Sequence, residues 1–228
     1  MVRRIEKLTL DHLPELSLPR CSSCLHWQLD PVRRSQLSGQ QAPDRDAAEK
    51  ATWVSTLLRE WGGCGAVALE DGHQVGHVIW GPSAYLPGLA SYPTAPTSPD
   101  AVVLANIHVA PAQRGAGLGR QLIRTMAKEL VRRKDFKAVE AISSTEPGGC
   151  EIPQDFLLAV GFATQRPHPK YPRMRMDLRT TLSLREELEL MLDRLLRPIP
   201  NPAPESGSGA RISSPRVSDR GPAARETG

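Results

Sequence analysis

Apolar and polar positions divide the middle of the chain into short segments. Residues 44–62, "DRDAAEKATWVSTLLREWG", predict a helix that ends at Gly62. Residues 65–70 ("GAVALE") and 75–81 ("VGHVIWG") predict two strands that flank the turn "DGHQ" and form a hairpin. Residues 101–109, "AVVLANIHV", predict a strongly apolar strand.

The segments that follow alternate between helix and strand. Residues 117–134 predict a helix, residues 137–143 a strand, residues 153–162 a short helix with Pro153 in its first turn, and residues 173–178 a half-buried strand. The apolar positions of the first of these helices are Leu118, Leu122, Ile123, Met126 and Leu130. The order of segments indicates a mixed α/β domain with a βαβ unit at its centre.

Three further stretches differ from this pattern. Residues 82–100 are dense in Pro, Ser and Ala and predict a long loop without regular structure, a kind of loop that is often functional. Residues 183–196 predict an amphipathic helix, in which Ser183 and Glu186 have capping-box spacing. Residues 198–228 are rich in Pro, Gly, Ser and Arg and are expected to be disordered. We therefore expect a domain over residues 1–179, a docking helix over 180–197 and a tail.

Composition narrows the class of protein. With 228 residues, 39% hydrophobic and 24% charged, the chain has an ordinary globular mix. Its net charge of +4 is spread along the chain without a dense basic stripe, so we expect no nucleic-acid partner, although a pocket for a phosphorylated cofactor would fit. No apolar run reaches the roughly 18 residues that a membrane span needs. The start of the chain lacks a signal-peptide pattern, so a cytoplasmic location is expected.

The most informative stretch is "ANIHVAPAQRGAGLGRQLI", in which a buried strand leads through Pro111 into a glycine-rich loop and a helix. Backbone N–H groups of such a loop and the helix dipole together form an anion site suited to a pyrophosphate. A dinucleotide fold would show G-x-G-x-x-G directly after the strand, whereas Gly115, Gly117 and Gly119 are spaced by two. The Gly-Lys-Ser/Thr ending of a P-loop is absent.

The motif Arg114-x-x-Gly117-x-Gly119, after a strand that ends in Val109-x-Pro111, resembles the acetyl-CoA-binding motif of the GNAT N-acetyltransferase superfamily. The resemblance covers roughly residues 65–178. It implies an α/β fold of the α+β type, with a mixed, mostly antiparallel central sheet flanked by helices, and acetyl-CoA as cosubstrate. It also implies that loop amides hold the pyrophosphate and that the backbone of Ile107 and Val109 pairs with the pantetheine. The loop residues concerned are Arg114, Gly115, Ala116, Gly117, Leu118, Gly119 and Arg120.

The second half of the resemblance shows two departures from the superfamily pattern. The helix that ends in Gly161-Phe162 usually carries a tyrosine four residues before the glycine and an asparagine that contacts CoA eleven residues before it. This chain has Leu157 and Cys150 at those positions. Near a helix N-terminus the pKa of a thiol falls toward the reactive range. Cys150 is therefore read in four ways: as a buried filler, as an acid or hydrogen-bond donor to the CoA sulfur, as a nucleophile, or as a site of redox control.

Other catalytic candidates lie on strands and beside them. Asn106 and His108 alternate with Ile107 and Val109, so they are expected to face the substrate cleft if the apolar pair faces the helices. His108 is a candidate general base, with a hydrogen-bonded strand histidine as the alternative. Tyr171, which follows His168 in "RPHPKYPRMRMDL", is the preferred donor of a proton to the leaving thiolate.

The chain has four cysteines, too few in this length for a disulfide framework. Cys21 and Cys24 have C-x-x-C spacing in "PRCSSCLHWQLDP", but a structural zinc site normally takes four ligands, and a thioredoxin-type site needs a βαβ context. We therefore expect no metal. The segment is interpreted as a cap over the acceptor end of the cleft, with Trp27 as an apolar wall and residues 82–100 opposite.

The function expected from these observations is N-acetyl transfer from acetyl-CoA directly to a primary amine. The acceptor could be a small metabolite, a drug-like amine, or a protein terminus or lysine, and transfer of a longer acyl group is a rival. Two other classes stay open: a CoA-binding regulatory module without catalysis, motivated by Leu157 and Cys150, and a redox-sensing adaptor that uses Cys21 and Cys24. No membrane partner is expected, and a homodimer is left open.

Overall fold

The sheet at the centre of the molecule has eight strands, seen in a computed structural model that describes residues 3–16, 21–37, 42–146 and 149–178. Its strands are β1 (Arg3–Lys7), β2 (Gly65–Glu70), β3 (His73–Gly81), β4 (Ala101–Val109), β5 (Ala138–Ser144), β6 (Ile152–Pro153), β7 (Ala163–Arg166) and β8 (Arg173–Asp177). The order is β1-β2-β3-β4-β5-β8-β7, with β6 beside β5. Only the β4–β5 and β5–β6 pairs are parallel, so the predicted mixed, mostly antiparallel sheet is confirmed.

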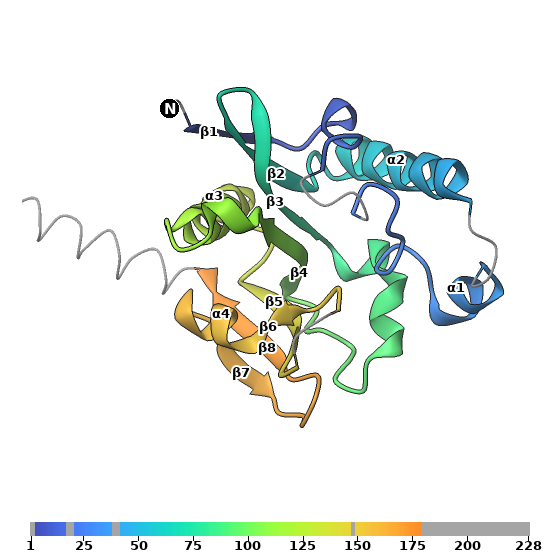
Figure 1. Ribbon diagram of the computed structural model, residues 1–228. Coiled ribbons are helices and arrows are strands. Elements are labelled where there is room, and N and C mark those ends of the chain that lie inside the picture. The colour runs from blue at the N-terminus through green and yellow to red at the C-terminus, as the bar shows by residue number, and fades with distance from the viewer. Residues whose placement is uncertain (1–2, 17–20, 38–41, 147–148, 179–228) are drawn as a thin grey trace, which may run out of the picture.

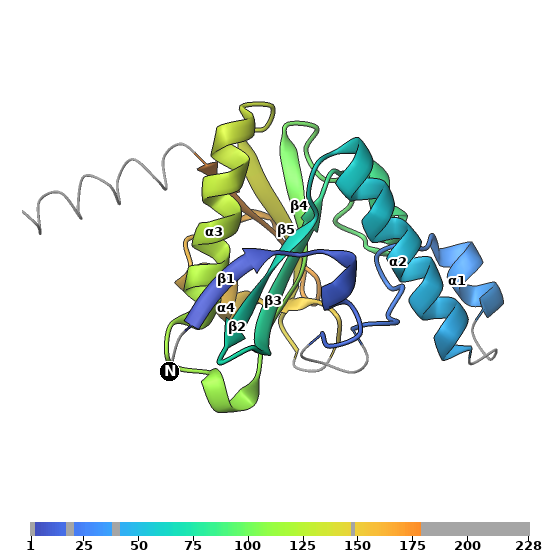
Figure 2. The ribbon, with the colours of Figure 1, turned by 90° about the horizontal axis from the view of Figure 1, so that it is seen from above.

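Helices cover both faces of this sheet (Figures 1 and 2). The helices α3 (Leu118–Arg133) and α4 (Gln154–Ala159) lie on one face, and α2 (Pro43–Glu60) lies on the other, with α1 (Pro31–Leu37) beyond it. Four short 3-10 segments complete the elements: η1 (Leu10–His12), η2 (Ser83–Tyr85), η3 (Pro87–Ser91) and η4 (Pro111–Gln113).

The main core lies between α3, α4 and the sheet. Every apolar position predicted for the helix after the glycine-rich loop is buried, and these side chains pack with strand residues such as Trp80, Val102 and Leu104. A second cluster lies on the opposite face and combines Trp27, Leu86, Leu89 and Tyr92 with strand residues. Because both faces of the central strands are covered, β4 and β5 are apolar through most of their length.

A β-bulge on β4 decides which of its side chains reach which face. Ile79 pairs with Asn106 and Trp80 pairs with Leu104, so Ala105 is the extra residue and the alternation of side chains shifts by one. Ile107 and Val109 therefore pack against the α3 side, together with Leu104. The condition under which Asn106 and His108 were expected to face the cleft is therefore met, and these two residues point to the other face of the sheet.

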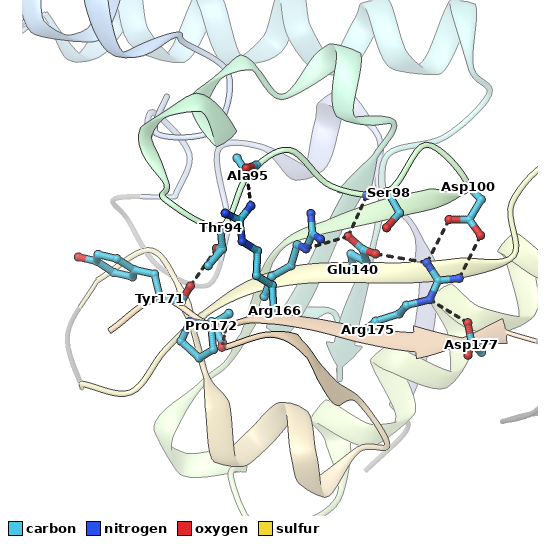
Figure 3. Close-up of polar contacts among 12 residues, drawn as sticks. Thr94, Ala95, Ser98, Asp100, Glu140, Arg166, Tyr171, Pro172, Arg175 and Asp177 are labelled. Atoms are coloured by element: carbon cyan, nitrogen blue, oxygen red, sulfur yellow. Dashed lines mark hydrogen bonds and ion pairs between the residues drawn. The ribbon is translucent and has the colours of Figure 1, made fainter. Parts of the chain in front are cut away.

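Polar contacts fix the place at which β4 and β5 stay together (Figure 3). The strands pair only from Ala101↔Ala138 to Val103↔Glu140. Glu140 is fully buried there, and its carboxylate accepts hydrogen bonds from Arg175 Nη1 at 3.2 Å and from the Ser98 backbone N–H at 3.0 Å. Charged donors on β8 thus compensate a buried carboxylate at the last pair before the strands part.

Several local expectations need correction. The strand β3 begins two residues before the predicted 75–81, and α4 is shorter than predicted because Pro153 belongs to β6 and to the N-cap position rather than to the first turn. Residues 82–100 are not structureless, since they contain η2 and η3 and bury Leu86 and Leu89. The elements β1, β6, β7 and α1 were not expected. The predicted helix over 183–196, the tail and the boundary at 179 lie outside the described residues.

Candidate functional site

The candidate site lies where β4 and β5 separate. Beyond Val103 the strand β4 pairs with β3 alone in the described part of the chain, while β5 turns to β6 and β8. A cavity of about 710 Å³ occupies this region, a size typical of small-molecule sites. Its lining residues are Asn106, Ile107, His108, Val109, Gln113, Arg114, Gly115, Gly117, Leu118, Gly119, Arg120, Glu146, Gly149, Cys150, Glu151, Ile152, Pro153, Phe156, Ala159 and Val160.

The glycine-rich loop borders one end of this cavity. Gly115 and Gly117 have φ angles of +81° and +78°, which only glycine adopts without strain, and a Cβ atom at either position would meet nothing within 4 Å. Gly117 is the N-cap of α3 and offers no side chain to the N–H groups of the first turn. These groups have no partner within their own helix, so they are available to an anion from the cavity.

The third glycine has a different purpose. A Cβ atom at Gly119 would lie 2.9 Å from the Phe156 ring, so this glycine lets α3 approach α4. Arg120 strengthens the same contact by donating from Nη2 to the Ala159 carbonyl at 3.1 Å. Arg114 turns back onto the strand and donates from Nε to the Val109 carbonyl at 3.0 Å. Both arginines thus brace the loop against the elements on either side of it.

Most of the predicted cofactor-binding residues border the cavity. Ile107, Val109, Arg114, Gly115, Gly117, Leu118, Gly119, Arg120 and Cys150 are among its lining residues, whereas Ala116 is not. The strand, loop and helix residues that the glycine-rich motif joins in sequence therefore also lie around one cavity in the structure. Ala116 lies between two glycines of positive φ, and its part in cofactor binding stays a prediction.

A pair of histidines lies on the face of the sheet opposite α3. His108 and His77 are direct partners across β4 and β3, and their ring centroids are 5.8 Å apart. His77 Nε2 lies 2.8 Å from Asn106 Oδ1, to which it donates. His108 lines the cavity, is 9% exposed, and its Nε2 has no hydrogen-bond partner among the described residues.

Burial keeps both histidines neutral. It lowers the pKa of His77 to about 4, and the hydrogen bond to Asn106 opposes that shift only in part. Burial also lowers the pKa of His108, with a smaller contribution from the Arg114 guanidinium. An uncharged imidazole with an unpartnered ring nitrogen can accept a proton. His108 borders the cavity with a lowered pKa, but its Nε2 is itself buried, so its role as a base stays a prediction. His77, by contrast, is a hydrogen-bonded strand histidine.

The other candidates are divided between the cavity wall and the region behind it. Cys150 is on the wall, while Leu157 is fully buried in the core. Tyr171 packs in the second cluster with its ring 5.2 Å from that of Tyr92, and its carbonyl accepts from Thr94 Oγ1 at 2.9 Å (Figure 3). His168 accepts the Tyr171 backbone N–H at 3.0 Å. Neither of these last two residues is among those that line the cavity.

The N-terminal segment meets the cavity through a chain of polar side chains. Glu151, on the wall, accepts a hydrogen bond from the Tyr92 hydroxyl, and His26 Nε2 lies 2.6 Å from the same hydroxyl oxygen. Trp27 stacks on Tyr92 with ring centroids 5.3 Å apart, behind the lining residues. Residues 21–29 and the loop over 82–100 thus pack against each other instead of facing each other across the cavity, and neither segment contributes a lining residue, so the expected placement of Trp27 and of this loop as opposite walls is wrong.

Sequence reasoning missed four residues of this region: His77, Glu151, Tyr92 and Lys50. The sequence contained a signal for two of them. His77 lies two positions before Ile79 in a predicted strand, so it shares a sheet face with an apolar residue, and Glu151 directly follows Cys150. Nothing local marks Tyr92 or Lys50. Lys50 is buried in α2 and donates from Nζ to the Cys24 carbonyl at 3.0 Å. No group of three or more His, Cys, Asp or Glu side chains within the described ranges has an arrangement that could hold a metal ion.

Comparison with known proteins adds a family and several structures. A model of the acetyltransferase (GNAT) family matches residues 25–148. Among solved structures, an N-acetyltransferase from Staphylococcus aureus Mu50 aligns at 14% identity and TM-score 0.51, over 78% of this chain and 100% of that one. A structure described only as an acetyltransferase aligns at 14% identity and TM-score 0.50, over 77% and 99%. These two share the fold of this chain.

A third structure is the PaiA N-acetyltransferase of Thermoplasma acidophilum in complex with coenzyme A, which aligns at 10% identity and TM-score 0.49, over 78% of this chain and 99% of that one. Among curated proteins, no sequence match was found. In the part of the chain that the structure covers, no helix has both the length and the apolar character needed to cross a membrane.

Proposed function

Because the chain belongs to the acetyltransferase (GNAT) family, we propose that it transfers an acetyl group from acetyl-CoA directly to a primary amine. The observation that carries the proposal is the separation of β4 from β5, which opens a cavity leading to the glycine-rich start of α3. Beyond Val103 this edge of β4 pairs with no other strand of the described residues, although Arg114 already donates to the Val109 carbonyl, and it lies beside a set of helix-terminal N–H groups. These two features suit the amide-bearing pantetheine and the pyrophosphate of one ligand.

The residues of the chain fit acetyl-CoA on three counts. Gly115 and Gly117 leave open space where a side chain would stand, so the pyrophosphate can approach the backbone of the loop. The first turn of α3 contains no acidic residue, so nothing there repels an anion. Ile107 and Val109 give the strand edge an apolar flank that faces α3. A bound acetyl-CoA would supply the activated acetyl group, and the protein would supply its position.

His108 is the residue that we assign to removal of the proton from the attacking amine. Its imidazole is neutral and borders the cavity, and its Nε2 is buried without a hydrogen-bond partner among the described residues, so the attacking amine would have to uncover that atom. Asn106 and His77 lie beside His108 on the same face of the sheet. The hydrogen bond between them holds both side chains in place, and His77 is the cross-strand neighbour of His108. Positioning contributes as much as proton transfer, because the amine must be held against the thioester.

Protonation of the departing thiolate has no dedicated tyrosine in this chain. Cys150 borders the cavity, whereas Tyr171 does not. Hydrogen bonding to Cys24 and burial raise the pKa of Cys150, so its thiol stays protonated, contrary to the lowered pKa expected near a helix N-terminus. Because the hydrogen bond with Cys24 already engages this thiol, we assign Cys150 a place in the wall beside the departing sulfur, with solvent supplying the proton.

A thiol-release assay tests the proposed function directly. The full chain is incubated with acetyl-CoA and, in turn, small primary amines, peptides with a free N-terminus and peptides that contain lysine. Release of CoA that depends on one acceptor class, with the acetylated product identified by mass spectrometry, is the expected result.

The second candidate function is a CoA-binding regulatory module. The buried Leu157, which replaces the usual donor, favours it. Tight acetyl-CoA binding without acceptor-dependent release across all three amine classes would support the module and contradict the transferase.

A further inference from the structure

Two cysteines from distant parts of the chain meet at the wall of the cavity. Cys24 belongs to the turn that precedes α1, and Cys150 precedes β6. Their sulfur atoms are 3.7 Å apart, although 126 residues separate them in sequence. Both thiols are free and partly exposed, and Cys150 is itself a lining residue. The partner of Cys24 is therefore not the one that its C-x-x-C spacing suggests.

The two sulfur atoms are chemically unequal. The hydrogen bond from Cys150 is the largest cause that lowers the pKa of Cys24 to about 6, and the His26 backbone N–H, the Lys50 ammonium and Arg34 act in the same direction. The same hydrogen bond raises the pKa of Cys150. These effects favour the thiolate at Cys24 and the thiol, which donates to it, at Cys150. Because peroxides react with thiolates, Cys24 is the sulfur that is oxidised first.

The remaining cysteines lack this activation. Cys64 is fully buried, and burial raises its pKa to about 12. Burial likewise raises the pKa of Cys21, and the neighbouring Cys24 adds to the shift. Cys24 is thus the cysteine whose pKa is lowered, whereas burial disfavours the thiolate form of Cys21 and of Cys64.

We infer that Cys24 and Cys150 form a reversible disulfide in response to peroxide and that this bond changes the cavity wall. In the first step the Cys24 thiolate attacks one oxygen of hydrogen peroxide, which gives a sulfenic acid at Cys24 and, after protonation, water. In the second step Cys150 attacks that sulfur, its proton and the hydroxyl group leave as a second water, and the S–S bond forms. The two electrons lost by the thiols reduce the O–O bond of the peroxide.

The second step follows from the first by electrostatics. Oxidation removes the negative charge of Cys24, and with it the main cause that keeps Cys150 protonated. Cys150 can then ionise and attack the neighbouring sulfur. The acidified thiol and its partner therefore divide the reaction between them, one reacting with the oxidant and the other closing the bond.

Formation of the bond requires a movement at the cavity. The sulfur atoms must close from 3.7 Å to about 2.0 Å. The Lys50 ammonium holds the carbonyl of Cys24, so the shift falls mainly on the Cys150 side, which is the cavity wall. The disulfide would also displace the side chain that we place in the wall beside the departing CoA sulfur, so both binding and turnover should fall.

The experiment uses the full chain. Protein treated with a small excess of hydrogen peroxide is alkylated, digested and mapped by mass spectrometry, and acetyl-CoA affinity is measured by calorimetry before and after treatment. Acetyl-CoA carries no free thiol that would reduce the bond. We expect a single peptide pair joined at Cys24 and Cys150 and a several-fold loss of acetyl-CoA affinity. Dithiothreitol should restore both the free thiols and the affinity.

Two matched variants distinguish the effect of the Cys24–Cys150 pair from that of the neighbouring Cys21. Cys24→Ser should give no cross-link and no peroxide effect, whereas Cys21→Ser, in the same turn, should respond as the original chain does. A link between Cys21 and Cys24, over-oxidation of Cys24 without a link, or a link that leaves affinity unchanged would overturn the inference. If the reduced chain does not bind acetyl-CoA at all, the proposed function fails, while the mapped disulfide still decides the chemistry of the pair.

Discussion

Gly117 and Gly72 adopt nearly the same backbone conformation in different surroundings. Their φ angles are +78° and +88°, and a Cβ atom at either would meet nothing within 4 Å. Gly72 lies in the turn between β2 and β3 and is not a lining residue, whereas Gly117 faces the cavity. An added methyl group therefore costs similar backbone strain at both places and obstructs a ligand at only one.

This contrast gives a prediction for the glycine-rich loop. Gly117→Ala and Gly72→Ala should each lower the free energy of unfolding by about 1 kcal/mol. Only Gly117→Ala should weaken acetyl-CoA binding, by about tenfold or more, which corresponds to about 1.4 kcal/mol. Denaturant titration and calorimetry measure the two quantities. Equal affinities in the two variants would contradict the placement of the pyrophosphate at this loop.

His108 offers a second test at the residue scale. A base works only when it is unprotonated, so activity should fall with decreasing pH as the imidazole gains its proton. Because burial lowers the pKa of His108, that fall should occur below the ordinary histidine range. His108→Gln should reduce kcat by about 10²-fold to 10⁴-fold and remove this acidic limb.

The exposed His73, at the start of β3, provides the matched substitution for this test. His73→Gln should preserve both the rate and the pH profile. An acidic limb that survives in His108→Gln would assign the base to another group, and the first residue to test would then be Glu151 on the same wall.

At the scale of elements, the split between β4 and β5 depends on where their pairing ends. Glu140 sits at that last pair with no exposed surface, between the guanidinium groups of Arg173 and Arg175. Arg175 also holds Asp100, at 3.0 Å, and Asp177 on its exposed side. The buried member of the network therefore joins the beginning of β4 to β5 and β8, while Asp177 only adds a surface contact.

Two of the three acidic partners of Arg175, Glu140 and Asp177, should differ in their effect on stability. Glu140→Gln leaves two guanidinium groups with a buried neutral partner and should lower the free energy of unfolding by roughly 3 kcal/mol. Asp177→Asn, whose side chain is 59% exposed, should cost at most about 1 kcal/mol. Urea denaturation of both variants makes the comparison. Similar small losses would show that Glu140 is not what secures the strands.

The elements that could be predicted from sequence are those whose burial leaves an apolar pattern. The strand β4 and the helix α3 are covered by neighbours, so their sequences are apolar at the positions that face the core. The edge strands β1, "RRIEK", and β7, "ATQR", were missed because backbone pairing to one neighbour holds them and their side chains need no burial. The same limit applies to α1, in which no residue is buried.

At the scale of the whole molecule, the predictable part of the site is the part that is contiguous in sequence. Strand, loop and helix residues from Ile107 to Arg120 carry their own motif. The contacts of Cys24 with Cys150 and of Tyr92 with Glu151 join segments that are far apart, and only the assembled fold brings them together. Cys24 and Cys150 could be singled out from the sequence, but their contact could not, and neither Tyr92 nor Glu151 was singled out at all.

The free energy of unfolding of the whole molecule should depend on pH because His77 is buried. His77 has a pKa of about 4 when folded, against an ordinary value of 6.5. Above pH 6.5 it is neutral in both states and contributes no pH dependence. Between pH 6.5 and 4 the unfolded chain binds the proton first, so the free energy of unfolding should fall by up to about 1.4 kcal/mol for each pH unit.

Substitution isolates this contribution from that of the other groups. His77→Gln keeps a donor for the Asn106 oxygen and removes the titrating ring, so the slope of stability against pH between 6.5 and 4 should become shallower. Replacement of the exposed His73 on the same strand should leave the slope as it is. Denaturant midpoints at several pH values measure the slopes. If His77→Gln and the original chain lose stability in parallel, then the acid sensitivity arises from other groups, and His77 is not held neutral by the packing that also shapes the site.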